Sequence, residues 1–261
     1  MNSEFYIPSP MDGMLGRKVP FITIGNRSVG EGFPTYVIAE IGINHNGDMD
    51  KAKRLIDVAA ECGVDAVKFQ KRTLDKIYQK KVLDDPNHYE EGFTYLIPIL
   101  KEVEFGLEQY QELYSYSKQK GLEFMCTPFD EDAVTFLEQF DLPAYKVASA
   151  DMTNLILLEK LVGTKKPLIL STGMSTLQDI DHIGNYLRKW EVECILLHCV
   201  SAYPTPLGDT HLNFMKVLKD RYGIPVGFSS HEIGIDVTLA AVAAGACVIE
   251  RHITLDKRLK G

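Results

Sequence analysis

The sequence predicts an α/β protein of the (β/α)8 class, a TIM barrel. Eight short apolar runs alternate with amphipathic stretches between residues 36 and 253. Several runs are almost continuously apolar, which is typical of parallel strands that helices cover on both faces. The chain has 261 residues, enough for one large α/β domain or two small ones. A doubly wound sheet is the alternative, but no predicted strand is followed by a G-x-G-x-x-G or G-x-x-x-x-G-K-[ST] loop.

The eight strands are predicted from short apolar runs rich in Val, Ile, Leu and Phe. They are expected at 36–42, 66–71, 122–127, 144–149, 167–172, 193–199, 225–230 and 247–253.

Helices are predicted between the strands, where apolar residues recur at helical spacing. Asp130 is a predicted N-cap, Ser175 with Gln178 resembles a capping box, and Gly63 follows the first helix as a stop signal. The predicted helices are 50–62, 107–119, 130–139, 154–162, 175–188, 211–221 and 235–244.

Three segments depart from the alternation. Residues 20–34 predict a hairpin that turns at Gly25-Asn26 or Asn26-Arg27 and closes the bottom of the barrel. Residues 72–106 predict a long functional loop at the opposite end. No helix follows the last strand before Gly261. We therefore divide the chain into an N-terminal arm and hairpin, 1–34, and a catalytic barrel, 35–261.

The composition of the chain limits the kinds of partner and the cellular compartment that we expect. The formal net charge of −8 disfavours nucleic acid and anionic membranes as partners. No apolar run approaches the roughly 20 residues that span a bilayer, and residues 1–18 lack the apolar core of a secretory signal. The five cysteines form no C-x-x-C pair, so we expect reduced thiols in a cytoplasmic protein.

Polar residues gather at the predicted strand ends, where TIM barrels carry their chemistry. Lys68 and Lys146, together with serine and threonine hydroxyls, predict a cradle for a phosphate or carboxylate. Glu40 lies within an apolar strand and therefore needs a partner. The strand-end residues are Glu40, Asn44, His45, Asn46, Lys68, Gln70, Arg72, Thr127, Lys146, Ser149, Ser171, Thr172, His198, Ser201, Tyr203, Ser229, His231, Glu250 and His252.

Two of the histidines suggest a metal site. His231 and His252 end the last two predicted strands, so both imidazoles can reach one ion. A structural role for each is the alternative. We expect His198 to be a hydrogen-bonded core residue, and His45 is equally compatible with a turn. A lysine-based Schiff-base aldolase, formed on Lys146 or Lys68, is a competing prediction that requires no metal.

The strand-end motifs taken together resemble the sialic acid synthase family. The match covers almost the whole chain after residue 35, in order and at barrel spacing. It rests on the segments IAEIGINHNGD (38–48), AVKFQ (66–70), CTPFD (126–130), PAYKVAS (143–149), LSTGM (170–174), LLHCVSAYPTP (196–206), GFSSH (227–231) and IERHITLDK (249–257).

The resemblance implies a reaction and a set of roles. It implies that phosphoenolpyruvate condenses with an N-acyl-mannosamine-type aldehyde to give a nine-carbon 2-keto acid and phosphate. His231 and His252 would bind a divalent metal, manganese before magnesium or cobalt, with Glu40 as a third catalytic residue. The phosphoenolpyruvate cradle would be Lys68, Gln70, Lys146, Ser149, Ser171 and Ser229, and Thr127 and Tyr203 would contact the sugar or the phosphate.

The resemblance also bears on the sugar and the assembly. Ser201 stands where some sialic acid synthases have Asn, which leaves legionaminic, pseudaminic and spore-coat sugars open. Relatives continue past TLDK into a final helix and an antifreeze-like domain, which a swapped homodimer supplies to the partner's sugar site. We therefore expect a C-terminally truncated homodimeric barrel. A barrel that binds phosphoenolpyruvate and metal without turnover is the further alternative.

Overall fold

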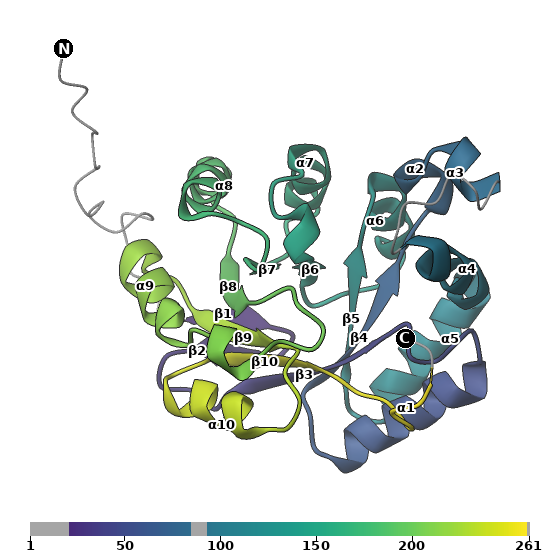
Figure 1. Cartoon of the computed structure of the whole chain (residues 1–261), viewed down its shortest axis with the longest axis horizontal. Helices are drawn as coiled ribbons and strands as arrows, with labels where there is room; N and C mark the ends of the chain where they lie inside the picture. The colour runs from purple at the N-terminus through teal and green to yellow at the C-terminus, as the bar shows by residue number, and fades with distance from the viewer. Residues whose placement is uncertain (1–20, 85–92, 260–261) are drawn as a thin grey trace.

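Eight parallel strands close into a barrel in the computed structural model, which describes residues 21–84 and 93–259. Strand β10 pairs with both β9 and β3, so the first and last barrel strands are neighbours (Figure 1). The predicted TIM barrel is therefore confirmed. Its strands are β3 (Tyr36–Gly42), β4 (Ala66–Lys71), β5 (Glu123–Pro128), β6 (Tyr145–Val147), β7 (Leu168–Ser171), β8 (Cys194–Cys199), β9 (Val226–Ser230) and β10 (Val248–His252).

The predicted strands agree with the observed ones to within one or two residues, and β6 differs most. It is only three residues long, because the chain turns at Ala148 into a 3-10 helix, η2 (Ser149–Asp151). The turn places the Ser149 hydroxyl where it accepts a hydrogen bond from the backbone N–H of Gly173, at 3.1 Å. Because β6 ends early, the segment that follows it is hydrogen-bonded to the loop after β7.

Helices surround the barrel, and their N-caps explain where they begin (Figure 1). Asp48 caps α1, and Asp130 caps α6 as predicted by accepting a hydrogen bond from the N–H of Ala133 at 2.7 Å. The helices of the alternation are α1 (Met49–Glu61), α5 (Leu107–Gln119), α6 (Glu131–Leu137), α7 (Leu155–Gly163), α8 (Leu177–Lys189), α9 (Asn213–Tyr222) and α10 (Asp236–Ala243).

The predicted capping box of α8, Ser175 with Gln178, is wrong by one residue. Thr176 is the N-cap and exchanges hydrogen bonds with Asp179, whereas the prediction placed the box one residue earlier. The reason is that the Ser175 N–H donates to the carbonyl of Thr172 at 3.1 Å. Ser175 therefore belongs to the turn after β7, and the helix starts later.

The prediction of a long loop over 72–106 was also wrong. The segment contains α2 (Leu74–Ile77), α3 (Lys80–Asp84) and α4 (Phe93–Val103). Ile97 and Leu100 on α4 are fully buried, and the apolar surface that they remove from water explains why the segment folds as a helix. Asp84 ends α3, and residues 85–92 of the predicted loop lie outside the described residues.

The N-terminal hairpin closes the bottom of the barrel, as predicted. Strands β1 (Phe21–Ile24) and β2 (Arg27–Gly30) pair around a turn at Gly25-Asn26, where Gly25 takes a φ of +60°. Ile22, Ile24 and Val29 are fully buried and belong to one apolar cluster with barrel residues of the strand starts. These barrel residues include Ile38, Ala66, Met125, Ala144, Ile169, Ile195 and Val248.

A second and larger apolar cluster lies between the strands and the surrounding helices, and contains Leu55, Leu113, Leu158 and Leu218. Neither apolar cluster occupies the mouth of the barrel at the C-terminal strand ends, where polar residues lie. No helix among residues 21–84 and 93–259 is long and apolar enough to cross a membrane. All five cysteines are free thiols, and four of them are buried.

Candidate active site

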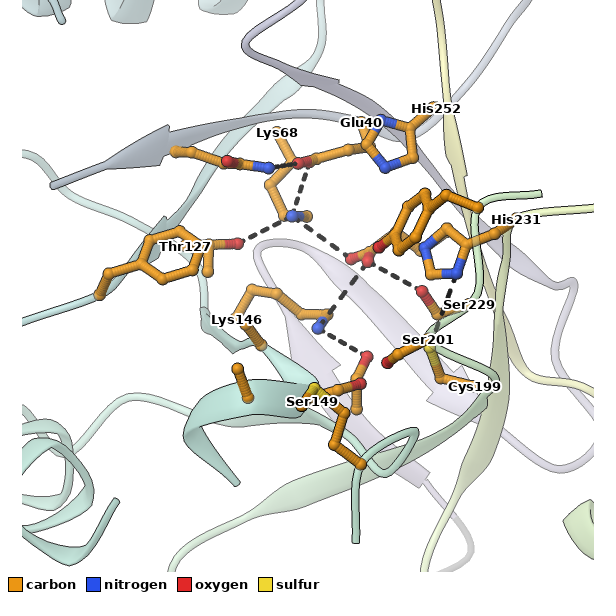
Figure 2. A pocket seen from close by; sticks show the side chains of 18 of the residues that line it. Glu40, Lys68, Thr127, Lys146, Ser149, Cys199, Ser201, Ser229, His231 and His252 are labelled. Carbon is orange, nitrogen blue, oxygen red and sulfur yellow. Dashed lines mark hydrogen bonds and ion pairs between the residues drawn. The ribbon is translucent and has the colours of Figure 1, made fainter. Parts of the chain in front are cut away.

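One cavity of about 320 Å³ opens at the C-terminal ends of the strands. Every barrel strand, or the loop that follows it, contributes at least one lining residue (Figure 2). All twelve residues predicted for the site line this cavity, although they are spread over 213 positions of the chain. They are Glu40, Lys68, Gln70, Thr127, Lys146, Ser149, Ser171, Ser201, Tyr203, Ser229, His231 and His252.

Lys68 and Glu40 form a buried ion pair on neighbouring strands. The parallel register sets Glu40 of β3 beside Lys68 of β4, and their charged atoms lie 2.6 Å apart. Lys68 also donates to the Thr127 hydroxyl at 2.8 Å, and the Gln70 amide donates to Glu40 at 2.7 Å. The partner that Glu40 was predicted to need is therefore Lys68.

Gly42 leaves room for this pair. It follows a bulge in β3 and takes a φ of +54°. A Cβ atom there would lie 3.0 Å from the Glu40 carboxylate and 3.1 Å from the Gln70 amide nitrogen. The side chains of Glu40 and Gln70 fill the space that the missing Cβ leaves.

Lys146 is held on the opposite wall. Its ammonium group donates to the Ser171 hydroxyl at 2.7 Å and to the Val147 carbonyl at 2.8 Å. Glu250 of β10 lies 3.8 Å from Lys146 and 3.7 Å from Lys68, and it accepts a hydrogen bond from Ser229 at 3.2 Å. One carboxylate thus links the two lysines.

Glu250 lies in this cluster, although the sequence predicts it only as a strand-end residue with no separate role. Alternation along a strand places Glu250 and His252 on the same face, so this signal was available. One carboxylate oxygen of Glu250 has no hydrogen-bond partner among the residues that the structure describes, which leaves it able to accept a bond from a ligand.

The two lysines differ in their electrostatics. Burial opposes the charging of Lys68, but Glu250 and Glu40 outweigh it and hold the pKa of Lys68 above its ordinary value. Burial dominates at Lys146 and lowers its pKa, and Glu250 offsets only part of the effect. Burial opposes the ionisation of Glu250 too, yet Lys146 and Lys68 keep its pKa low. Of the two lysines in the cavity, Lys68 thus holds its proton more firmly and Lys146 is easier to deprotonate.

The two imidazoles lie on the same side of the cavity, on β10 and directly after β9. Their ring centroids are 5.8 Å apart, and the centroid of the Tyr203 ring lies 4.0 Å from that of His231. Nδ1 of His231 lies 2.9 Å from the Val200 carbonyl, which can only accept, so Nδ1 carries the hydrogen. The lone pair of Nε2 is then available to a ligand.

The donor set at this wall fits a divalent cation held by two imidazoles. Burial lowers the pKa of His252, which favours the neutral ring that a metal requires. Burial also opposes protonation of His231, but Cys199 and the Val200 carbonyl outweigh it and raise the pKa of His231. A metal would therefore compete with a proton there. Within the described part of the chain, no three His, Cys, Asp or Glu residues are grouped as a metal would require.

Cys199 and His198 lie as strand alternation predicts, on opposite faces of β8. Cys199 lines the cavity, with its sulfur 3.9 Å from Nδ1 of His231. His198 faces the helices, and its Nε2 lies 2.7 Å from the Thr210 carbonyl. The expected core imidazole is confirmed. His45 lies in the turn after β3, buried and stacked on Phe105, and does not line the cavity.

These features define an enzyme-type TIM barrel, with a buried cluster of charged groups and two imidazoles at the strand ends. The NeuB family model matches residues 55–261. The chain therefore belongs to the NeuB family.

Individual relatives agree with this assignment. N-acetylneuraminate-9-phosphate synthase of Mus musculus is 41% identical over 241 residues, which are 90% of this chain and 66% of that protein. N,N'-diacetyllegionaminic acid synthase of Campylobacter jejuni is 39% identical over 232 residues, covering 87% and 70%. The crystal structure of an N-acetylneuraminic acid synthetase from Leptospira borgpetersenii superposes with a TM-score of 0.83 at 35% identity, covering 90% and 79%. The chain spans about two thirds of the length of the curated relatives it matches.

Proposed function

We propose that this barrel joins carbon 3 of phosphoenolpyruvate to the aldehyde carbon of an N-acyl-mannosamine-type sugar, giving a nine-carbon 2-keto acid and phosphate. The observation that carries the proposal is the cavity itself. It sets two ammonium groups, several hydroxyls and two imidazoles around one space, in a chain related to sugar-acid synthases.

The residues have distinct tasks in this reaction. Lys68 and Lys146, with Ser149, Ser171 and Ser229, hold the phosphate and carboxylate of phosphoenolpyruvate. Binding that anion replaces the contacts that the two lysines now make with Glu250, at 3.7 and 3.8 Å. The two lysines thus keep a negative partner when the anion binds.

Carbon–carbon bond formation leaves positive charge at carbon 2 of phosphoenolpyruvate, and the new alkoxide takes up a proton. Glu40 is held by Lys68 and Gln70, and it orients the water that adds to carbon 2. The tetrahedral adduct then breaks its carbon–oxygen bond to phosphate. His231 and His252 would hold a divalent metal, with manganese as the proposed ion and magnesium or cobalt as alternatives; when bound, it supplies Lewis acidity to the cavity.

The experiment that tests the proposal is phosphate release with a panel of mannosamine-type sugars. Phosphoenolpyruvate and manganese are added to this chain. In a parallel assay they are added to a version extended at its C-terminus by the antifreeze-like domain of a relative. Release that requires both phosphoenolpyruvate and a sugar supports the proposal. If phosphoenolpyruvate binds but neither version releases phosphate, the barrel is a non-catalytic binding protein. Because Ser201 replaces the Asn of some sialic acid synthases, we expect the preferred sugar of the panel to differ from N-acetylmannosamine.

Replacing His252 by Ala tests the metal. We expect manganese-dependent turnover to be lost while thermal unfolding stays cooperative, because the side chain ends β10 and contributes little to the apolar clusters. Electron paramagnetic resonance of added manganese gives a readout that does not depend on turnover. Unchanged activity and unchanged manganese binding would remove the metal from the mechanism.

One observation favours a second candidate, a Schiff-base aldolase. Burial lowers the pKa of Lys146, and a neutral amine is the form that attacks a carbonyl. Borohydride added with pyruvate would then trap a covalent adduct on Lys146, detectable as a mass increase. We expect no adduct.

We further propose a homodimer in the cytoplasm, which rests on the resemblance to swapped dimers of the family and on the reduced cysteines. Sedimentation velocity on this chain and on the C-terminally extended version measures the assembly directly.

A further inference from the structure

A third cation lines the cavity, and none of the proposed roles uses it. Arg72 directly follows β4, and its guanidinium carbon lies 3.7 Å from the centroid of the Phe129 ring, which directly follows β5. This stacking holds the planar guanidinium against one wall of the cavity.

Arg72 differs from the two lysines in having no carboxylate of its own. Lys68 and Lys146 both lie within 4 Å of Glu250. No Asp or Glu oxygen among residues 21–84 and 93–259 forms an ion pair with the Arg72 side chain.

Three carboxylates act on Arg72 electrostatically, those of Glu104, Glu40 and Asp151, and none of them forms an ion pair with it. Glu104 forms an ion pair with Lys71, and Glu40 is held by Lys68 and Gln70. Glu104 and Glu40 cannot turn to the guanidinium without taking a carboxylate from another buried cation, which is costly, and Asp151 is held by the Asn154 amide at 3.2 Å. Among residues 21–84 and 93–259, Arg72 is therefore left without an ion pair, and an anionic ligand would supply one.

The surroundings of Arg72 make an anionic ligand favourable. Burial lowers the pKa of its guanidinium, and Tyr78, Glu104 and Glu40 offset only part of that effect. Its fork of N–H donors matches two oxygens of a phosphate, and such charge-assisted pairs are stronger than neutral hydrogen bonds.

We propose that Arg72 binds a phosphate monoester in this cavity. The choice of compounds rests on the proposed function, which offers two sources for this group: phosphoenolpyruvate itself, or an amino-sugar substrate that is phosphorylated. In the second case Arg72 selects the phosphorylated sugar over the free one.

Calorimetric titrations distinguish the two sources. The titrants are phosphoenolpyruvate, N-acetylmannosamine 6-phosphate and N-acetylmannosamine, and the proteins are the wild type, Arg72→Met and Arg72→Lys. Arg54→Met is the matched control, because Arg54 lies on the exposed face of α1 with its side chain 56% accessible. We expect Arg72→Met to bind one phosphorylated compound about ten-fold more weakly or worse, with Arg72→Lys in between. Binding of the unphosphorylated sugar should not change.

The phosphorylated compound that loses affinity identifies the source. Equal affinities of wild type and Arg72→Met for both phosphorylated compounds would overturn the proposal, and so would a wild type that binds neither. Labelling with phenylglyoxal gives a second measurement that needs no variant: the compound that binds Arg72 should slow modification of that residue, read by mass spectrometry of its peptide. Modification at the same rate with either compound also overturns the proposal.

These outcomes are independent of turnover. Phosphate release that persists with unaltered affinities in Arg72→Met would refute the role of Arg72 and leave the proposed function standing. Arg72-dependent binding without phosphate release would do the reverse.

Discussion

At the scale of single residues, the site is a set of buried charges that alternate in sign. Glu40, Lys68, Glu250 and Lys146 follow one another through contacts of 2.6, 3.7 and 3.8 Å, and each is almost fully buried. Such a chain is stable only while every member is present, because removing one leaves a neighbour charged and unpaired. The same chain is ready to accept an anion at its two ammonium groups.

Replacing Lys68 by Met should therefore affect both stability and binding. We expect the free energy of unfolding to fall by about 3–5 kcal/mol, because Glu40 loses its principal cation. Phosphoenolpyruvate affinity should fall far more than sugar affinity. Adding Glu40→Gln to Lys68→Met should recover part of the stability and none of the phosphoenolpyruvate affinity.

Urea unfolding and calorimetry measure the two quantities. Lys76→Met is the matched control, since Lys76 pairs with Asp132 on the surface, where water screens the ion pair and its removal should hardly change the free energy of unfolding. A Lys68→Met protein as stable as this control would show that the buried carboxylates do not depend on Lys68.

His45 gives the fold a predictable pH dependence. Burial lowers its pKa from 6.5 to about 4, and its Nδ1 accepts a hydrogen bond from the Gly47 N–H at 3.2 Å. Between those two pKa values the unfolded chain binds a proton that the folded chain does not, so stability falls as the pH decreases from 6.5 toward 4. The complete effect is about 3 kcal/mol.

The comparison of wild type with His45→Gln isolates this effect. We expect the wild type to lose more unfolding free energy than the variant between pH 7 and about pH 4, measured by urea unfolding at each pH. Parallel curves for the two proteins would mean that His45 keeps its ordinary pKa in the fold. His45 does not line the cavity, so phosphoenolpyruvate affinity at pH 7 should be the same in both.

At the scale of elements, the loop between β9 and α10 is fixed by one residue of β10. Arg251 donates to the carboxylate and the carbonyl of Glu232, at 2.9 and 2.8 Å, and to the Thr238 hydroxyl at 2.8 Å. Arg251 directly precedes His252, and Glu232 directly follows His231. The contact on the outer face of the barrel therefore holds in place the backbone that carries both imidazoles on the inner side.

Arg251→Met should loosen this loop. Glu232 is buried, and the loss of its cation should cost about 3 kcal/mol or more. Amide hydrogen exchange at residues 231–238 should accelerate beyond what the loss of global stability explains. Exchange in β4 and β5 should change only as much as the global free energy of unfolding does. Arg258→Met is the control, because Arg258 forms only an exposed pair with Asp256. Equal exchange at 231–238 in the two variants would show that Arg251 does not hold the loop.

The elements also show what a sequence can and cannot predict. The strands, and the gathering of the twelve predicted residues at one cavity, were predictable because parallel strands give apolar runs, and because strand ends in a barrel converge on one mouth. Helix α4 was missed because its apolar residues are adjacent as well as periodic, and because Pro98 lies inside it. The position of Arg72 against Phe129 was not predictable, since it depends on how two loops meet in space.

At the scale of the whole molecule, the barrel separates stability from chemistry. The bottom is closed by the hairpin β1–β2, whose Ile22, Ile24 and Val29 pack into the interior at the strand starts. The cavity lies at the other end, where the strand ends are polar. A change at the hairpin should therefore alter the free energy of unfolding and leave ligand binding unaffected.

Ile24→Ala is the sharpest test of this separation. Ile24 is fully buried, and truncating it should cost about 2–5 kcal/mol through lost apolar burial and the cavity left behind. Its neighbour Thr23 points outward and is exposed, so Thr23→Ala should change stability by less than about 0.5 kcal/mol. Urea unfolding measures both. Phosphoenolpyruvate affinity, measured well below the unfolding transition, should be identical in wild type and both variants, because the folded fraction still has the same strand ends. A phosphoenolpyruvate affinity that weakened with Ile24→Ala alone would mean that the hairpin controls the register of the barrel strands as well as closing them.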